Sequence, residues 1–371
     1  DLPARHRRPP MRQFRQLLHS RFMWGVTFSD LIYRYRQFLI AIVGAGVVFA
    51  MALAMTGLAA GFSAEINWTI GGINADRWVL SSNAHGLVSN GQLLPQADTT
   101  AIAQSPGVTR AAGLAILPQQ VARINGHTKT VLVFGVELGN IGDPAVTSGQ
   151  ALTGPGQVVA DTRVGTAVGS QITIGSMSFR VVGQVVNRTM LAGLPIVFMP
   201  LRDAQVLALG GRPLTTAVVT RGVPSQVPAG LAVLTTPEIE HDQLTPLTAA
   251  VASINSFKFL LWAVAAIIIA ALLYVSALQR VRDFAVLKAL GSSSLLLFES
   301  LALQAVTVTL LAAALAAIVA NFLGVFFAQP VVIPGSAFAV LPLIAIVVGL
   351  LSSLVAVRRA TSADPAAAFG G

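Results

Sequence analysis

Residues that could hold a metal ion stand together in one short stretch of the 371-residue sequence, and they are Glu238, Glu240, His241 and Asp242. Carboxylate and imidazole groups are ligands that divalent metals accept. The same stretch also fits a solvated helix with a threonine N-cap (Thr235 or Thr236), since acids near a helix N-terminus are stabilised by its dipole. We favour the helix and predict no metal site.

The sequence lacks the motifs that would give the chain a catalytic or nucleotide-binding site of its own. It has no G-x-x-x-x-G-K-[ST] phosphate loop, no H-E-x-x-H motif and no G-x-S-x-G turn. It also has no cysteine, which excludes disulfides, cysteine–zinc sites and thiol nucleophiles. We therefore expect a protein that is not itself an enzyme and binds no cofactor.

One short charged segment, RVRDFAVLKALGSS (280–293), lies between two long apolar runs. If it is helical, its apolar residues recur at spacings of three and four and form one stripe. Gly291 followed by Ser292 is typical of a helix C-terminus. A short amphipathic helix of this kind either lies on lipid headgroups or docks in the groove of a partner protein.

The composition around this segment is that of a membrane protein. Hydrophobic residues make up 54% of the chain and charged residues only 11%, and the mean hydropathy is +0.73. A soluble domain is about 25% charged. Four uncharged stretches reach the length of about 20 residues that spans a bilayer, and they are 38–60, 260–278, 301–328 and 338–357.

The distribution of charge predicts the orientation of these spans. The segments 1–37, 279–300 and 358–371 hold 13 Lys and Arg against 5 acids, whereas residues 61–259 hold 11 against 10. By the positive-inside rule the three basic segments are cytoplasmic. The 61–259 domain and the 329–337 loop then lie outside. Topology accounts for the net charge of +9, so we expect no nucleic-acid binding.

The 61–259 segment combines strand and helix patterns without a regular βαβ period, which predicts an α+β domain. Strands are expected at 128–136, 156–161 and 196–199, with a hairpin over 170–186. Helices are expected at 98–109, directly after Pro200 and over 236–258, and the last of these continues into the second span. The fold class is therefore membrane α-helical, with four transmembrane helices and a large extracytoplasmic α+β domain between helices 1 and 2.

Several of these segments resemble MacB/FtsX-type ABC transporter permeases. Residues 280–292 look like the signature after the family's second span, a basic-acidic start followed by an apolar triplet and [KR]-A-[LM]-G-[AS]. Residues 358–369 are similar to its closing R-R-A-x(3)-D-P-x-x-A-L, although Phe369 replaces the leucine. The 30–36 segment is similar to the stretch before its first span, and 154–202 to the late part of its periplasmic domain.

The resemblance implies a mechanism called mechanotransmission, in which a separate ATPase drives the permease. Two permease copies and two cognate ABC ATPase subunits form the complex in a bacterial inner (plasma) membrane, and the ATPase binds ATP and Mg. Closure of the ATPases pushes on short cytoplasmic helices and moves the outside domain. The resemblance favours docking of the 280–293 helix on the ATPase. In the 1–37 arm, residues 11–24 form a second basic amphipathic pattern, which is expected to lie along the inner membrane surface through attraction to anionic lipids or to share in the ATPase contact.

The residues expected to couple to the ATPase are Arg280, Arg282, Asp283, Phe284, Leu287, Lys288, Leu290 and Gly291. A further contact is expected from the C-terminal tail, through Arg358, Arg359, Asp364 and Pro365. The function implied is export of a substrate, or its extraction from the membrane or its outer face. The alternative is an FtsX-like signalling or scaffold protein that activates a cell-wall hydrolase through an extracytoplasmic partner.

Overall fold

The computed structural model describes residues 35–84, 86–88, 93–279, 294–327 and 329–361. The chain divides into two compact units, which are described in turn below. The first unit comprises Asp1–Gly57, Ile254–Phe326 and Ile333–Gly371, and the second comprises Leu58–Ser253 and Phe327–Val332.

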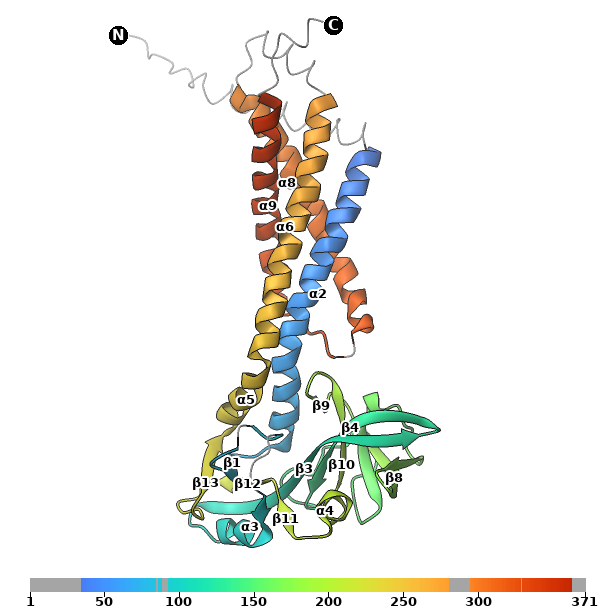
Figure 1. Ribbon diagram of the computed structural model, residues 1–371, viewed down its shortest axis with the longest axis vertical. Coiled ribbons are helices and arrows are strands. Elements are labelled where there is room, and N and C mark those ends of the chain that lie inside the picture. The colour runs from blue at the N-terminus through green and yellow to red at the C-terminus, as the bar shows by residue number, and fades with distance from the viewer. Residues whose placement is uncertain (1–34, 85, 89–92, 280–293, 328, 362–371) are drawn as a thin grey trace, which may run out of the picture. The chain divides into compact units, whose positions relative to one another are not determined.

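Four long helices supply the first unit (Figure 1), and they are α2 (Tyr35–Ile73), α6 (Thr248–Gln279), α8 (Ser294–Leu323) and α9 (Gly335–Thr361). Each contains a stretch long and apolar enough to cross a membrane. The prediction of four apolar helices with a large domain between the first and the second is confirmed. The third predicted span extends past Leu323, where α8 ends and a 3-10 turn (Gly324–Phe326) follows.

Small residues let the helices of the first unit approach one another closely. A Cβ atom on Gly46 of α2 would lie 2.9 Å from the Leu315 side chain, and one on Gly349 of α9 would lie 2.8 Å from Thr309 Oγ1. Buried alanines occupy the same core from all four helices, among them Ala45, Ala265, Ala312 and Ala345. Because lipid gives no hydrophobic drive for helix association, close van der Waals packing of this kind holds the bundle together.

The contact at Gly349 gives a direct test of this packing. We expect Gly349→Leu to lower the thermal stability of the full chain in detergent micelles by about 1–3 kcal/mol, because the added side chain overpacks the α8–α9 contact. Gly335→Leu is the matched control at the start of the same helix, where a Cβ meets nothing within 4 Å. Equal melting temperatures for the two variants would contradict the packing described here.

The second unit is built on an 11-stranded sheet in the order β13-β1-β12-β3-β4-β10-β6-β8-β5, with β7 and β9 paired to its side. The pairs β10–β4 and β6–β8 are parallel, and the other pairs of the sheet are antiparallel. Its strands are β1 (Arg77–Ser81), β3 (Val108–Ile124), β4 (His127–Val136), β5 (Ser148–Gly149), β6 (Gln157–Asp161), β7 (Gln171–Ile174), β8 (Met177–Val185), β9 (Thr189–Met190), β10 (Leu194–Pro200), β12 (Ala217–Gly222) and β13 (Leu231–Thr235). A separate two-stranded sheet pairs β2 (Leu94–Pro95) with β11 (Leu214–Thr215).

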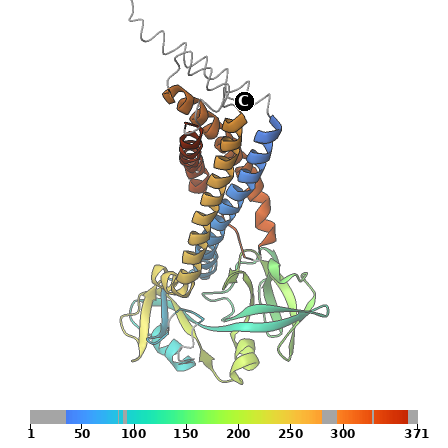
Figure 2. The same cartoon turned by 45° about the horizontal axis from the view of Figure 1, so that its top comes forward.

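The long strand β3 runs through the sheet (Figure 2) and contributes to two hydrophobic cores, one on each face. Successive side chains of a strand point to opposite faces. Leu114 and Ile116 accordingly lie in one core, while Ala115 and Leu117 lie in the other. Helix α4 (Leu201–Leu209) packs in the second core, and the end of α2 packs in the first. The sheet is therefore covered on both faces.

The structure confirms the strands predicted at 128–136, 156–161 and 196–199, the hairpin over 170–186 and the helix after Pro200. Helix α3 (Gln96–Ala103) is shorter than the helix expected at 98–109, because the chain enters β3 at Val108. The helix expected over 236–258 consists of α5 (Thr236–Leu244), a 3-10 turn (Thr245–Leu247) and the start of α6. Strands β1, β3, β12 and β13 were not predicted.

Candidate functional site

The last turns of α2 form part of the hydrophobic core of the sheet. Ile66, Ile70 and Ile73 follow one another at helical spacing, and their exposed fractions are 1%, 1% and 4%. They pack in the same cluster as Trp78 of β1 and Phe198 of β10. Full burial of each isoleucine is worth about 1.5–3 kcal/mol. The end of α2 and the sheet consequently form one packed body within the second unit.

Polar contacts from residues 187–193, a short connection that contains strand β9, reinforce this packing, and we call this segment the clasp. The backbone N–H of Gly193 donates to Glu65 Oε1 at 2.7 Å. The Thr69 hydroxyl donates to the carbonyl oxygen of Thr189 at 2.7 Å. The guanidinium of Arg188 donates to the carbonyl oxygen of Trp68. Three contacts, spaced along the side of α2, thus hold the helix against the clasp.

The clasp has an unusual backbone. Asn187, Leu191 and Ala192 have φ angles of 58°, 56° and 65°, and Gly193 has a φ of 91°. Positive φ is uncommon for residues with a side chain, and such conformations persist where surrounding contacts determine them. The contacts with α2 are of that kind. The shape of the clasp and the position of α2 therefore depend on each other.

The buried carboxylate of Asp161, at the end of β6, fixes the start of the clasp. Asp161 is fully buried, and its two oxygens accept from the backbone N–H groups of Arg163 (2.8 Å) and Arg188 (2.7 Å). Burial raises the pKa of Asp161, while these hydrogen bonds and the two nearby guanidinium groups oppose the rise. Burial lowers the pKa of Arg188, and the attraction to Asp161 opposes that shift.

A glycine on α2 makes room for the Arg188 side chain. A Cβ atom on Gly72 would collide with the guanidinium group, whereas one on the neighbouring Gly71 would meet nothing within 4 Å. The guanidinium lies near the C-terminal end of α2, where the helix dipole favours a positive charge. Gly72 and Arg188 are therefore complementary parts of one contact.

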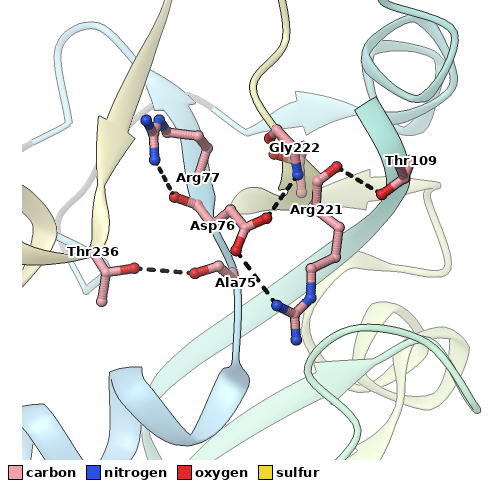
Figure 3. A network of polar contacts seen from close by, with 8 residues as sticks. Ala75, Asp76, Arg77, Thr109, Arg221, Gly222 and Thr236 are labelled. Atoms are coloured by element: carbon pink, nitrogen blue, oxygen red, sulfur yellow. Dashed lines mark hydrogen bonds and ion pairs between the residues drawn. The ribbon is translucent and has the colours of Figure 1, made fainter. Parts of the chain in front are cut away.

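Beyond the end of α2, a second polar network joins the chain to β12 and α5 (Figure 3). The carboxylate of Asp76 accepts from the Gly222 N–H at 2.8 Å and from the Arg221 guanidinium at 3.4 Å. The Thr236 hydroxyl donates to the carbonyl oxygen of Ala75 at 3.1 Å. The Asp76–Arg221 ion pair is substantially exposed and contributes at most about 1 kcal/mol. The network mainly fixes the direction of the chain between α2 and β1.

The chain also leaves the sheet toward the second long helix at this place. Strand β1, which follows α2, pairs along its whole length with β13, which precedes α5, from Arg77↔Thr235 to Ser81↔Leu231. Helix α5 then begins with a capping box, in which Thr235 and Glu238 satisfy each other's backbone N–H groups. Adjacent strands thus connect the end of α2 to the start of the α5–α6 segment.

The segment between α8 and α9 touches α2 as well. A Cβ atom on Gly61 would collide with the carbonyl oxygen of Pro330, so the two backbones are in direct contact there. Only glycine permits such an approach of two backbones. Gly61 lies one turn before the residues of α2 that contact the clasp.

None of the residues predicted to couple to an ATPase can be placed. Residues 280–293 lie outside the described residues, as do Asp364 and Pro365. Arg358 and Arg359 fall in the last turns of α9, but their side chains are not described. The helix interpretation of the acidic stretch at 238–242 is confirmed, because Thr235 caps α5 and Glu238 lies in its first turn. No group of potential metal ligands occurs among the described residues.

Sequence reasoning missed the clasp and its partners. Residues 187–193 received no prediction of their own between the hairpin at 170–186 and the strand at 196–199, and Asp161 was only the last residue of the strand predicted at 156–161. One signal was available, since two adjacent glycines (Gly71 and Gly72) at the end of an apolar helix indicate a close approach by another part of the chain. The sequence does not show that the approaching group is Arg188.

Models of two protein families match the chain over adjoining segments. The MacB-like periplasmic core domain matches residues 38–244, and the FtsX-like permease C-terminal domain matches residues 255–365. The boundary between the two matches falls in the α5–α6 segment described above. The chain therefore belongs to the MacB/FtsX-type ABC transporter permeases, as its sequence motifs indicated, and a permease of this class works with an ATPase partner.

Relatives of nearly the same length carry the same class name. The chain is 39% identical over 349 residues to an uncharacterized ABC transporter permease of Mycobacterium tuberculosis, and 37% identical over 349 residues to a second one from the same species. Each alignment covers 94% of this chain and 100% of the relative.

Two solved structures are similar at low identity. The periplasmic region of MacB from Actinobacillus actinomycetemcomitans is 13% identical with a TM-score of 0.36, and the match covers 47% of this chain and 96% of that one. The extracellular domain of the transporter YknZ from Gram-positive bacteria is also 13% identical, with a TM-score of 0.33 and coverage of 43% and 99%.

The adjacent glycines give a matched test of the clasp. We expect Gly72→Ala to displace the Arg188 guanidinium and to raise the rate of tryptic cleavage after Arg188 at least about tenfold, since a hydrogen bond from a charged group is worth about 1.5–3 kcal/mol. Gly71→Ala should leave the rate unchanged, because the space around Gly71 is open. Cleavage timed by mass spectrometry measures both rates, and equal rates would show that Arg188 does not hold the clasp.

Asp161 gives a test that depends on pH. Asp161→Asn should destabilise the protein by about 1–3 kcal/mol. The amide has only one acceptor oxygen, so its NH2 group would face one of the two backbone N–H groups and leave that N–H without an acceptor. Since the folded pKa of Asp161 is raised, its contribution is fullest below the unfolded pKa of about 3.9 and falls as pH rises through the folded value. The stability difference between wild type and variant should shrink over that window. Urea unfolding at several pH values measures it, and a difference that grows with pH would contradict the sign.

Proposed function

We propose that this chain is the membrane subunit of an ABC system that converts ATP hydrolysis by a separate ATPase into movement of its sheet domain. The movement serves export of a substrate or its extraction from the membrane. ATP and Mg are bound by the ATPase, and two copies of each subunit make up the complex. The family to which the chain belongs and the absence of a phosphate loop from its sequence support this assignment.

The observation that carries the proposal is the way α2 ends. A helix that includes a membrane-length apolar stretch also supplies Ile66, Ile70 and Ile73 to the core of the sheet. The clasp and the Asp76 network hold the same helix end by hydrogen bonds. A displacement of α2 within the second unit must therefore move the sheet or break this core, which is the property that a mechanical transmitter requires.

The second exit from the sheet supports the same mechanism. Because β1 and β13 are paired, a force on the end of α2 reaches α5 through one strand pair. The distribution of basic residues supports an orientation with both termini and the 280–293 segment in the cytoplasm and the sheet domain outside. With that topology, the ATPase acts on the cytoplasmic ends of the long helices, and these are the ends that lie farther from the sheet domain along the chain.

The coupling segment provides the functional test. We expect the triple variant Arg282→Ala, Phe284→Ala and Leu287→Ala to lose most of the stimulation of ATPase activity, because the apolar stripe and its basic edge would dock on the ATPase. The assay uses the chain in nanodiscs together with its cognate ATPase, after co-purification of the two. The matched control is Ser292→Ala with Ser293→Ala, beyond the glycine that ends the stripe. Full stimulation by the triple variant would refute this docking site.

A further inference from the structure

A cavity of about 200 Å³ lies among three helices of the first unit. Its walls come from α2, α6 and α9 and are mostly apolar, with Leu53, Val340 and Ile344 among them. An apolar cavity of about 150 Å³ is already large enough to hold a benzene-sized ligand. The space is partly open to the surroundings of the bundle, as is a larger space of about 540 Å³ between α6 and α9, so its size alone does not identify an occupant.

The cavity carries one positive charge. Lys258 of α6 lines it, together with the ring of Trp262 one turn further on. The ammonium nitrogen lies 3.0 Å from Asn255 Oδ1 and 5.7 Å from the centre of the Trp262 ring. It forms no ion pair with any carboxylate in the part of the chain that the structure describes. The half-buried charge is therefore held in place by neutral groups alone.

The rest of the lining is compatible with an anion. None of the eleven residues around the cavity is acidic. Ser336 contributes a hydroxyl group, whereas the Thr56 hydroxyl donates to the carbonyl oxygen of Ala52 at 3.0 Å. Ser336 and Ala337 lie in the first turn of α9, where the helix dipole is positive. The charge and the dipole act together on one end of an otherwise apolar space.

The position along the helices limits what can enter. Lys258 and Trp262 lie where the uncharged stretch of α6 begins, and lysine and tryptophan are the residues that anchor a helix at the membrane–water interface. An occupant must therefore combine an anionic group at the interface with an apolar part that reaches into the hydrocarbon. A free phosphate ion would gain nothing from the apolar walls, and a neutral lipid would leave Lys258 without a counter-charge.

We propose that this cavity binds an anionic membrane lipid in the leaflet on the side of the sheet domain. An acyl chain enters between α2, α6 and α9, and the headgroup phosphate is bound by the ammonium of Lys258. The proposal goes beyond the coupling function proposed above and does not depend on it, because it concerns binding by this chain alone. It can fail while coupling to the ATPase stands, and the reverse also holds.

Quenching of Trp262 fluorescence by brominated lipids measures occupancy directly. The full chain is reconstituted in phosphatidylcholine nanodiscs that contain increasing fractions of phosphatidylglycerol brominated on its acyl chains. A parallel series uses brominated phosphatidylcholine. The variant Trp262→Phe defines the part of the quenching that comes from this tryptophan. We expect half-maximal quenching at a fraction of brominated phosphatidylglycerol about fivefold lower than that of brominated phosphatidylcholine. A factor of this size corresponds to the attraction between one basic residue and an anionic lipid surface.

Two pairs of variants separate a site from general attraction. Lys258→Gln should abolish the preference, whereas Arg36→Gln, which removes an exposed charge from α2, should keep it. Ala337→Leu fills the cavity and should reduce quenching by both brominated lipids. Ala339→Leu, on an exposed position of the same helix, should not.

The outcomes are distinct. Equal quenching by the two brominated lipids, or an unchanged preference in Lys258→Gln, would overturn the proposal, because Lys258 and Trp262 would then be a simple interfacial anchor. Competition by millimolar inorganic phosphate in the buffer would also overturn it in favour of a free-anion site. Loss of preference in Lys258→Gln, with the preference retained in Arg36→Gln, would establish the lipid site.

Discussion

The burial of three isoleucines at the end of α2 is the constraint on which the second unit depends. Ile66, Ile70 and Ile73 place one face of the last turns of the helix in the core of the sheet. The positive φ angles of the clasp and the hydrogen bond from the Arg188 N–H to the buried Asp161 depend on a helix that is held in that position. Helix α2 therefore takes part in two different cores. It packs in an alanine-rich core in the first unit and supplies isoleucines to the core of the second unit.

Packing between small residues distinguishes the first unit from the second. Gly46 and Gly349 bring helices close enough that a single methyl group would disturb them. The sheet unit instead fills its cores with large aliphatic and aromatic side chains such as Phe134 and Phe198, whose rings pack edge to face at 5.6 Å. This contrast follows from the solvent, because burying large apolar groups is favourable in water and nearly neutral in lipid.

Sequence reasoning predicted features that rest on local pattern. The apolar helices, the β7–β8 hairpin around Gly175 and the capped α5 each carry their signal in consecutive residues. It missed β1 and β13 because each is five residues long and gains its stability from pairing with residues 150 or more positions away in the sequence. It missed the partnership of Arg188 with Gly72 for the same reason, since neither residue shows its partner. The predicted coupling residues lie outside the described part of the chain, so that prediction stands untested.

The backbone contact between Gly61 and Pro330 has a consequence for the kinds of motion open to α2. A screw motion of the helix by one residue, which combines a rise of about 1.5 Å with a turn of about 100°, would bring Ala60 or Phe62 against the Pro330 carbonyl in place of Gly61. Rotation about the axis would do the same. Rotation and screw motion of α2 by one residue are therefore opposed at this point unless the segment between α8 and α9 moves too. Motions that keep Gly61 facing Pro330, such as tilting of α2 or its movement together with that segment, avoid the collision.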